Sequence, residues 1–309
     1  MSIAVGLLLY AAVLAWFGPW ILTKLTDSGI NPHLGVAAWL TALSGVAAAW
    51  LAAIVVVILE TFDGLVSGPV WTLCVEFLGH AGQIDMARPA AATVAIALIG
   101  AALMFSAAAS WRIGQVLRKL RSHSRQHAMA ARVVGSPTRW RDVVVVHAEY
   151  PAAYCVAGRP RAIVVTTAAL ASLKGDQLSA VLAHEQAHLR GRHNALLMLL
   201  RAVAAGLPQV PLVAAGPEAV ARLLEMCADD AAARRYGPHP LLCGLMTLVA
   251  RPPLPLAAVG ATTTAVLDRA SRLAAPAPRA ARWRDRVRLC AAITLTIATP
   301  LCAAALCHH

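Results

Sequence analysis

Four long stretches without a charged side chain constrain the fold of this 309-residue chain more than any other feature. They cover residues 2–23, 34–59, 89–111 and 289–307. Each is close to the ~20 residues that an α-helix needs to cross a bilayer. The chain is 59% hydrophobic and only 14% charged, which is too apolar for an ordinary soluble domain. We therefore expect a mainly α membrane protein with four transmembrane helices.

The charges between these stretches predict the orientation. Residues 60–88 carry a net charge of −3, whereas residues 112–286 carry 24 Lys and Arg against 10 Asp and Glu. Because basic flanks stay on the cytoplasmic side, we expect a cytoplasmic domain over 112–286. The rest would be three transmembrane helices with an acidic outer loop (1–111), and a fourth helix with a short tail (287–309).

The motif H-E-x-x-H at residues 184–188 is the clearest sign of chemistry. Two histidines four residues apart on a helix point the same way and can share one metal ion. Glu185 lies beside them, where its carboxylate can take a proton from a water molecule. The alternative is a structural helix with two hydrogen-bonded histidines and a salt-bridged glutamate. It does not explain three polar residues on the apolar side of a helix.

The residues around the motif predict a small α+β domain. Two β-branched runs, 143–146 and 162–165, are expected to form strands of an antiparallel sheet, with residues 155–157 at an edge. Asp176 is a candidate cap for the motif helix, and Gly191 a candidate end.

A second helix is predicted from Pro217 to Gly237. The stretches 195–215 and 240–266 are apolar but interrupted by proline and arginine. They fit either buried helices or segments that rest against the bilayer, and we favour the second because this much apolar surface exceeds what a domain of this size needs.

A catalytic zinc needs three protein ligands, so the motif requires one more. His193 is one residue early for the pattern H-E-x-x-H-x-x-G-x-x-H, and Asp230 is a second candidate. Glu225, in the second predicted helix, is the third and strongest. Asp229 shares its face and can accept a hydrogen bond from a ligand histidine. Periodicity alone fits a solvated helix face equally well.

Two segments resemble a known family: IVVTTAALASLKGDQLSAVLAHEQAHLRGRHN and, further on, LLEMCADDAAARR. They are similar to the cytoplasmic peptidase core of the BlaR/MecR family of integral-membrane zinc metallopeptidases, relatives of HtpX and the CAAX-prenyl proteases. The resemblance covers roughly residues 140–236 and implies a gluzincin-type domain between spans 3 and 4. It also implies the plasma membrane of a bacterium, with the peptidase domain in the cytoplasm.

The resemblance assigns roles to the candidate site residues. It implies that Zn2+ is bound by His184, His188 and Glu225, and that Asp229 orients a ligand histidine. Glu185 would be the catalytic base. Candidates for holding the oxyanion are residues 234–236 and 239.

The implied activity is that of a zinc-dependent metalloendopeptidase acting in signal transduction. The expected partners are a cytoplasmic protein substrate, of which a transcriptional repressor is one candidate, and membrane lipids; a homo-oligomer is left open. Residues 151–158 would hold the substrate in extended form. The best-known relatives carry a penicillin-binding sensor after the last span. Here only residues 308–309 follow the last uncharged stretch, so we expect no sensing of a β-lactam by acylation.

Three other functions are weighed against this one. A broad membrane-protein quality-control protease shares the chemistry. A non-proteolytic membrane transducer with a structural zinc would not need Glu185. A nucleic-acid binder is suggested by the basic domain, but its basic residues gather at membrane flanks, so no direct nucleic-acid binding is expected. The seven scattered cysteines show no C-x-x-C pair and predict no disulfide framework.

Overall fold

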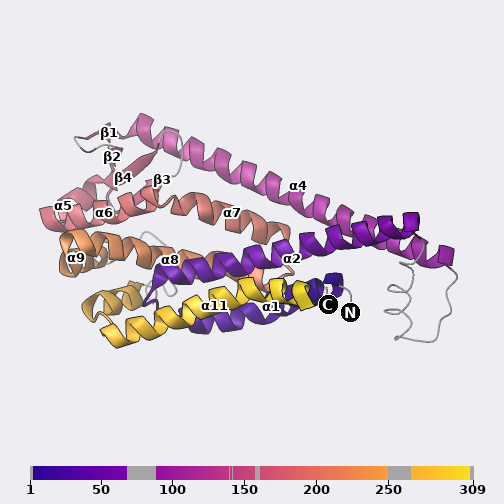
Figure 1. Ribbon diagram of the computed structural model, residues 1–309. Coiled ribbons are helices and arrows are strands. Elements are labelled where there is room, and N and C mark those ends of the chain that lie inside the picture. Colours follow the sequence, from indigo (N-terminus) through magenta and orange to yellow (C-terminus); the bar gives the residue numbers. More distant parts are fainter. Residues whose placement is uncertain are drawn as a thin grey trace.

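The computed structural model describes residues 3–67, 88–138, 140, 142–156, 161–249 and 266–306. Helices dominate (Figure 1). The long helices are α1 (Ile3–Thr26), α2 (Pro32–Ser67), α4 (Arg88–Val134), α8 (Pro211–Tyr236) and α11 (Arg279–Leu306). The strands are β1 (Ser136–Pro137), β2 (Val143–Val146), β3 (Ala153–Val156) and β4 (Ala162–Thr166). The shorter helices are α5 (Thr167–Ser172), α6 (Gly175–Arg190), α7 (His193–Gly206) and α9 (Pro238–Val249), and residues 266–274 are also helical. Most of the predicted outer loop 60–88, and residues 250–265 of the apolar stretch 240–266, lie outside the described residues.

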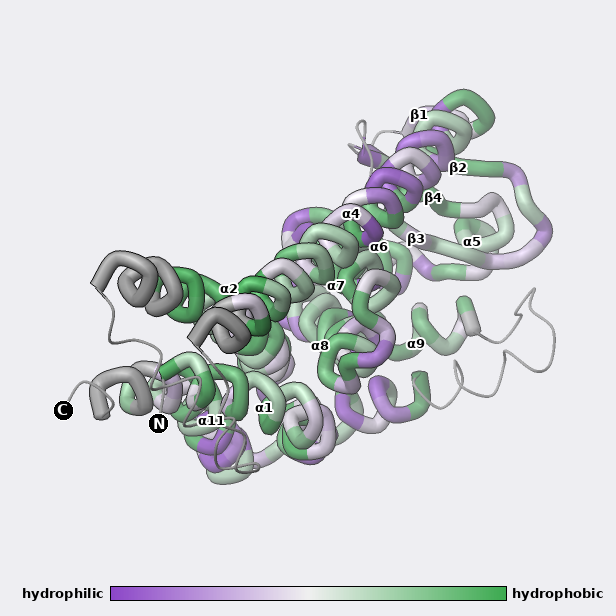
Figure 2. The backbone as a smooth tube through the Cα atoms, turned by 90° about the vertical axis from the view of Figure 1, so that its right-hand side faces the viewer, coloured by the Kyte–Doolittle hydropathy of each residue, from purple (hydrophilic) through white to green (hydrophobic). Residues whose placement is uncertain are grey.

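Three helices are long and apolar enough to cross a membrane, through their segments Ile3–Thr26, Pro32–Leu59 and Ile96–Val134. Figure 2 shows long hydrophobic stretches along all three. This supports the expectation of a membrane protein. The fourth predicted span, 289–307, falls in α11, and the structure does not describe several side chains near the end of this helix. The fourth span therefore stays a prediction.

The third predicted span does not end where the basic residues begin. α4 is one unbroken helix of 47 residues, or roughly 70 Å at 1.5 Å per residue. Its last turns carry Ala128 and Ala131, which are buried against the sheet. The predicted boundary at residue 111 thus marks a change of composition within a continuous helix.

The spans and the predicted cytoplasmic domain share a core. α1 and α2 form a hairpin that packs against α11 and α8 (Figure 1). Trp39 of α2 is fully buried at the centre, and its indole N–H donates to Thr26 Oγ1 at 3.3 Å. Val220 and Leu223 of α8 belong to the same cluster. Burying side chains of this size stabilises by about 1.5–3 kcal/mol each, so α8 is firmly attached to the hairpin.

The turn between α1 and α2 is fastened to α8 by polar contacts as well. The guanidinium of Arg222 donates to the carbonyl oxygens of Thr26 and Asp27, each at 2.9 Å. Gly29 adopts a φ of +57°, and a Cβ there would lie 2.2 Å from the sulfur of Met226. Glycine adopts this left-handed conformation without strain and leaves room for the Met226 side chain.

The four strands form one sheet in the order β1-β2-β4-β3. β2 and β4 run parallel, with Val143 opposite Ile163, so the prediction that they form an antiparallel sheet is wrong. The reason is the intervening strand: the chain reverses through β3, which pairs antiparallel to β4, so β4 returns in the direction of β2. All five residues of β4 are buried, as befits a strand between two neighbours. β3 pairs antiparallel to β4 at the edge, where residues 155–157 were expected. α4 covers one face of the sheet and α5 with α6 the other.

The helix predicted to start at Pro217 starts earlier. α8 begins at Pro211, with this proline in its first turn, and Pro217 lies inside the helix. Proline fits the first turn because the N–H it lacks has no partner there. Pro211 and Pro217 both fit the first turn of a helix. The burial of Leu212 and Val213 in the interior favours a start at Pro211. The helix ends at Gly237, as predicted.

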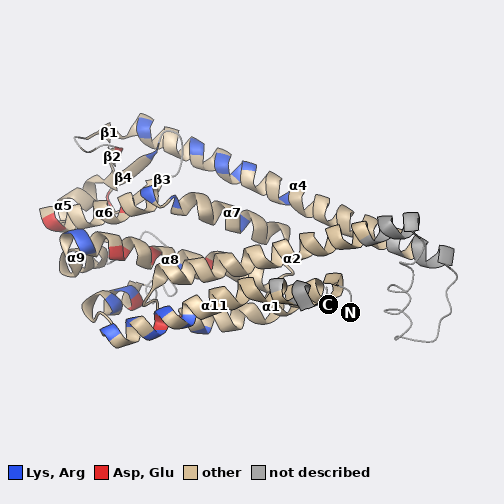
Figure 3. Ribbon diagram, viewed as in Figure 1, with Lys and Arg blue, Asp and Glu red and all other residues tan. Residues whose placement is uncertain are grey.

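Charged residues are unevenly distributed over the described chain. They gather toward the end that holds the sheet, α6, α9 and the start of α11, whereas the residues coloured tan, blue or red in the opposite halves of α1, α2 and α4 are almost all uncharged (Figure 3). A bilayer around the uncharged end would be compatible with this distribution, because charge in a hydrocarbon layer is costly.

Candidate metal centre

α6 is held at both ends by local hydrogen bonds. Its N-cap is Lys174, whose backbone N–H is bound by the Gln177 side chain at 3.1 Å. Asp176 was the predicted cap, but it lies in the first turn, where its negative charge interacts favourably with the positive end of the helix dipole. At the other end the N–H of Gly191 bonds to the carbonyl of Ala187 at 2.8 Å, as predicted.

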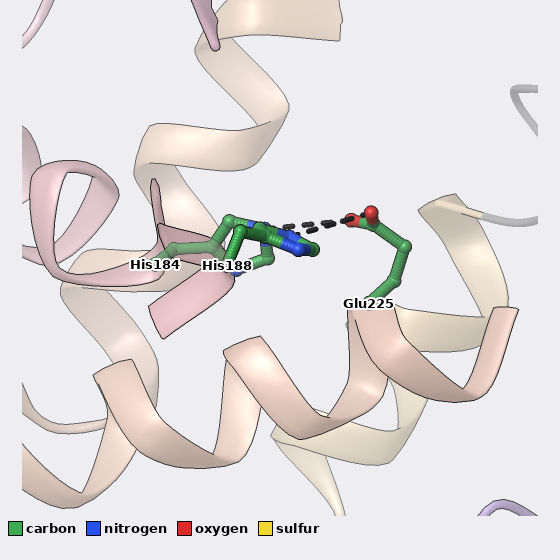
Figure 4. A group of neighbouring side chains, drawn as sticks. All are labelled: His184, His188 and Glu225. Atoms are coloured by element: carbon green, nitrogen blue, oxygen red, sulfur yellow. Dashed lines mark hydrogen bonds and ion pairs between the residues drawn. The ribbon is translucent and has the colours of Figure 1, made fainter. Parts of the chain in front are cut away.

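The inner face of α6 carries the H-E-x-x-H motif. His184, Glu185 and His188 are 4%, 9% and 7% exposed, respectively. Glu225 projects toward the two imidazoles from α8 (Figure 4). The two histidine Nε2 atoms lie 3.1 Å apart, and each is 3.4 Å from one carboxylate oxygen of Glu225.

This spacing fits a metal ion. All three candidate ligand atoms lie within 4.8 Å of one another. A tetrahedral zinc with bonds of about 2.0–2.1 Å separates its ligand atoms by about 3.3 Å. Two imidazole nitrogens and one carboxylate oxygen are also the donors of a catalytic zinc site, which keeps its fourth position open.

Asp229 lies against one of the histidines. It lies one turn after Glu225, is fully buried, and places Oδ1 3.0 Å from His184 Nδ1. The two ring nitrogens of His184 therefore face two carboxylates, Nδ1 that of Asp229 and Nε2 that of Glu225. Asp229 is therefore not on a solvated helix face, which the periodicity of the sequence also allowed.

A buried arginine holds both carboxylates. Arg269, in the helical residues 266–274, donates to the two carboxylate oxygens of Asp229 at 2.8 and 2.7 Å. Its Nη1 lies 3.2 Å from Glu225 Oε2. The planar guanidinium suits this task because it offers several donors in fixed directions.

His193 contacts the other histidine of the motif. Its Nδ1 lies 2.9 Å from His188 Nδ1, on the side of the ring away from Glu225. His193 is therefore not a third ligand; it is a hydrogen-bond partner of a candidate ligand. The two rings meet only because residue 191 is glycine: a Cβ there would lie 2.3 Å from His193 Nε2.

The carboxylates and the imidazoles shift one another's pKa. Burial lowers the pKa of His184, but hydrogen bonds to Asp229 and Glu225 outweigh it and raise the pKa to about 9. Burial would raise the pKa of Glu225, yet His184, His188 and Arg269 hold it far below its usual range. The pKa of His193 is lowered to about 4, chiefly by burial. Without a metal, the His184 ring is therefore positively charged at neutral pH, whereas the His193 ring is neutral.

Glu185 stands apart from the three converging ligand atoms. Burial raises the pKa of its carboxyl group, which the neighbouring His184 and His188 oppose. The thiol of Cys155 in β3 is its neighbour, and burial with the charge of Glu185 raises the thiol pKa to about 12, so the thiol stays protonated. Asn194 contacts Cys155 as well, through its Nδ2 at 3.3 Å from the carbonyl oxygen.

The edge strand lies next to this centre. The N–H of Thr166 donates to the carbonyl of Ala152, so residues 152 and 154 direct their backbone groups toward β4. By alternation, Ala153 and Cys155 direct theirs toward the open edge. β3 packs against α6, which places this edge close to the motif.

Other candidates lie elsewhere. Asp230 forms an ion pair with Arg272 at 2.7 Å and does not reach the centre. Of the residues considered for the oxyanion, Tyr236 packs in an apolar cluster of α6, α8 and α9, and Arg235 stacks on its ring. His239 contacts only Cys243 among the described residues.

Sequence reasoning missed Arg269, Cys155 and Asn194 as parts of the centre. Arg269 lies outside the segments that resemble a known family, between Asp268 and Arg272, and nothing local distinguishes it from an exposed basic residue. No local pattern marks Cys155 or Asn194.

Comparison with known proteins supports a peptidase. Residues 116–247 match the sequence pattern of peptidase family M48, a family of metallopeptidases. The matched part includes α6 and α8, and therefore all three candidate ligands. No curated protein and no solved structure shows a significant match. The match supports a metallopeptidase domain in this part of the chain.

Proposed function

We propose that this protein is an integral-membrane zinc metallopeptidase that cleaves a cytoplasmic protein. The proposal rests on the centre between α6 and α8, where two imidazoles and the carboxylate of Glu225 converge at 3.1–3.4 Å. The buried Glu185 lies beside this centre and is not one of the three candidate ligands. A purely structural zinc site would have a fourth protein ligand and no need for Glu185.

The proposed chemistry divides the work among four side chains. His184 and His188 would hold the metal through Nε2, and Glu225 through its carboxylate. When bound, a zinc ion would polarise a water molecule and lower its pKa toward ~7. Glu185 takes the proton of the attacking water at its carboxylate and then gives it to the leaving amine nitrogen. Its raised pKa lies nearer to neutral pH than that of an ordinary carboxyl group, so Glu185 can both accept and release a proton there.

The substrate would bind as an extra strand along β3. The backbone groups of Ala153 and the N–H of Cys155 face the open edge and can pair with an extended peptide, whereas the Cys155 carbonyl already accepts a hydrogen bond from Asn194. Cys155 of this edge strand is also a neighbour of Glu185, which brings a peptide bound along β3 next to the proposed catalytic residue. A regulatory protein, such as a transcriptional repressor, is the proposed substrate, and its support is the resemblance of residues 140–236 to the BlaR/MecR family.

The test compares the full chain with its Glu185→Gln variant in detergent. Both proteins should bind about one zinc ion per chain, because Glu185 is not a ligand. Only the unmodified protein should cleave a co-expressed panel of cytoplasmic repressors and unfolded membrane proteins. Cleavage restricted to a repressor supports the regulatory role, whereas broad cleavage of unfolded proteins identifies a quality-control protease.

Two other results would reject the proposal. If both proteins bind zinc and neither cleaves any substrate, the centre is structural and the protein is a non-proteolytic transducer. If neither binds zinc, the metal site itself is wrong.

A further inference from the structure

A cavity of about 340 Å³ lies where the α1–α2 turn meets the start of α11. It is separate from the metal centre and shares none of its residues. Its walls combine two apolar side chains from the turn with one acidic and three basic side chains. The residues used below are Lys24, Leu25, Ile30, Arg284, Asp285 and Arg288.

The cavity carries uncompensated positive charge. Among the described residues, none of the three basic side chains has an ion-pair partner; Lys24 only contacts the ring of Trp20, with Nζ 3.9 Å from its centroid. Asp285 is already engaged: its Oδ2 accepts a hydrogen bond from Asn31 Nδ2 at 2.7 Å. The cavity wall therefore has three positively charged side chains and one carboxylate, which is already hydrogen-bonded. This excess of positive charge favours an anion with several acceptor oxygens.

The cavity lies at the end of two uncharged helical stretches. Lys24 is the first charged residue after the stretch 2–23, and Arg288 is the last before the stretch 289–307. α1 runs toward the cavity and α11 runs away from it, and the two helices pack together. Both helices thus change from uncharged to charged at the same level, which marks the cytoplasmic boundary of the bilayer if they span it.

We propose that this cavity binds the phosphate headgroup of an anionic phospholipid of the inner leaflet. Trp20, whose ring contacts Lys24, and Ile21 belong to the turn of α1 before the cavity and are 62% and 46% exposed, so a lipid would place acyl chains on these apolar side chains. A soluble phosphate would leave them uncovered. Lys24, Arg284 and Arg288 bind the phosphate oxygens, while Leu25 and Ile30 form the apolar wall.

The bound lipid would also steady the metal centre. The turn that lines the cavity is hydrogen-bonded by Arg222 of α8, which lies less than one helical turn before Glu225. Arg272 bonds to the carbonyl of Gly29 at 3.4 Å and to Asp230 of α8 at 2.7 Å. The α1–α2 turn would therefore contact the lipid on one side and α8, the helix that carries Glu225, on the other.

The test measures binding of phosphatidylglycerol by the full chain in phosphatidylcholine nanodiscs. The variant Arg284→Gln/Arg288→Gln removes two cavity cations. The control Arg282→Gln/Arg286→Gln removes two exposed cations from the same helix that do not line the cavity. Loss of a direct hydrogen bond between a cation and a phosphate weakens binding by about tenfold, so the first variant should bind about 100-fold more weakly. The control should lose much less.

Each other outcome overturns the inference. Equal losses in both variants mean diffuse attraction by a basic flank and no site. Inorganic phosphate that binds in phosphatidylcholine discs as tightly as phosphatidylglycerol, and is lost with the same variant, identifies a soluble anion as the occupant. The assay requires no peptidase activity, so its result is independent of the proposed function. Unchanged thermal unfolding of both variants confirms that the fold is intact.

Discussion

His193 and His188 face each other through their Nδ1 atoms, and only one of the two can carry the hydrogen. Because Nε2 of His188 points to the candidate ligands, its Nδ1 bears the hydrogen and His193 accepts it. The lowered pKa of His193, about 4, keeps that ring neutral and able to accept. Each candidate ligand histidine thus has its own partner, Asp229 for His184 and His193 for His188.

Replacement of His193 tests this role. His193→Phe keeps an aromatic ring but removes the acceptor, and loss of such a partner typically weakens metal affinity by about 10–100-fold. His193→Asp, which restores an acceptor, should recover most of it. Zinc affinity is measured by competition with a chelator, with His239→Phe as the control, since His239 is exposed and outside the centre. Unchanged affinity in His193→Phe would mean that the ring only fills space.

The raised pKa of His184 predicts a pH-dependent zinc affinity. The metal-free protein holds this proton up to about pH 9, and a ligand imidazole must be neutral, so zinc binding displaces it. Affinity should rise by about tenfold per pH unit between pH 7 and pH 9, with about one proton released. In the metal-free protein the stabilisation from charged His184 is complete below its unfolded pKa and is lost as the pH rises through about 9.

Calorimetry in buffers of different ionisation enthalpy measures the released proton. Asp229→Asn is the matched comparison, because loss of the carboxylate lowers the His184 pKa and should flatten the slope. A slope that Asp229→Asn leaves unchanged would show that the displaced proton does not reside on His184.

At the scale of elements, the centre depends on a segment distant in the sequence. The helical residues 266–274 supply Arg269, whose side chain is only 11% exposed and pairs with the fully buried Asp229. A third element thus fastens α8 against α6. Leu273 of the same segment joins the apolar cluster with Ala180 of α6 and Ala232 of α8.

Arg269→Gln should destabilise the protein more than its loss of packing suggests. It leaves the Asp229 charge buried with only His184 beside it, and breaking a buried pair costs about 3–5 kcal/mol. The double variant Arg269→Gln/Asp229→Asn removes both charges and should recover part of the loss. Urea unfolding of the metal-free protein measures this, with Arg279→Gln as an exposed control. If the double variant is less stable than the single one, the two side chains do not act as a pair.

For the whole molecule, the separation of charged and uncharged ends predicts a topology. The basic flanks of α4 and α11 should be cytoplasmic, and the acidic segment 60–88 should face outside. The native Cys74 of that segment offers a probe. With the other cysteines replaced, a membrane-impermeant maleimide should label Cys74 in intact cells. A cysteine introduced at the exposed Ser122 should react only after permeabilisation. The reverse pattern would place the metal centre outside.

The local parts of this protein could be predicted from its sequence. The uncharged stretches predict α1, α2 and the start of α4, because the number of residues that spans a bilayer is fixed by helix geometry. The i, i+4 spacing places His184 and His188 on one face of α6 for the same reason. The β-branched runs predict β2 and β4, though not their parallel pairing, since pairing depends on where the chain returns.

The tertiary structure decided the rest. Glu225 and Asp229 fit a solvated face equally well by periodicity, and only the packing of α8 against α6 shows that Asp229 is buried. His193 changed from candidate ligand to partner of His188 because their Nδ1 atoms face each other, and Gly191 leaves room for the His193 ring. Arg269 had no local signal at all. Local spacing determines which residues share a face of one element; which faces meet is determined by burial and ion pairing between elements far apart in the chain.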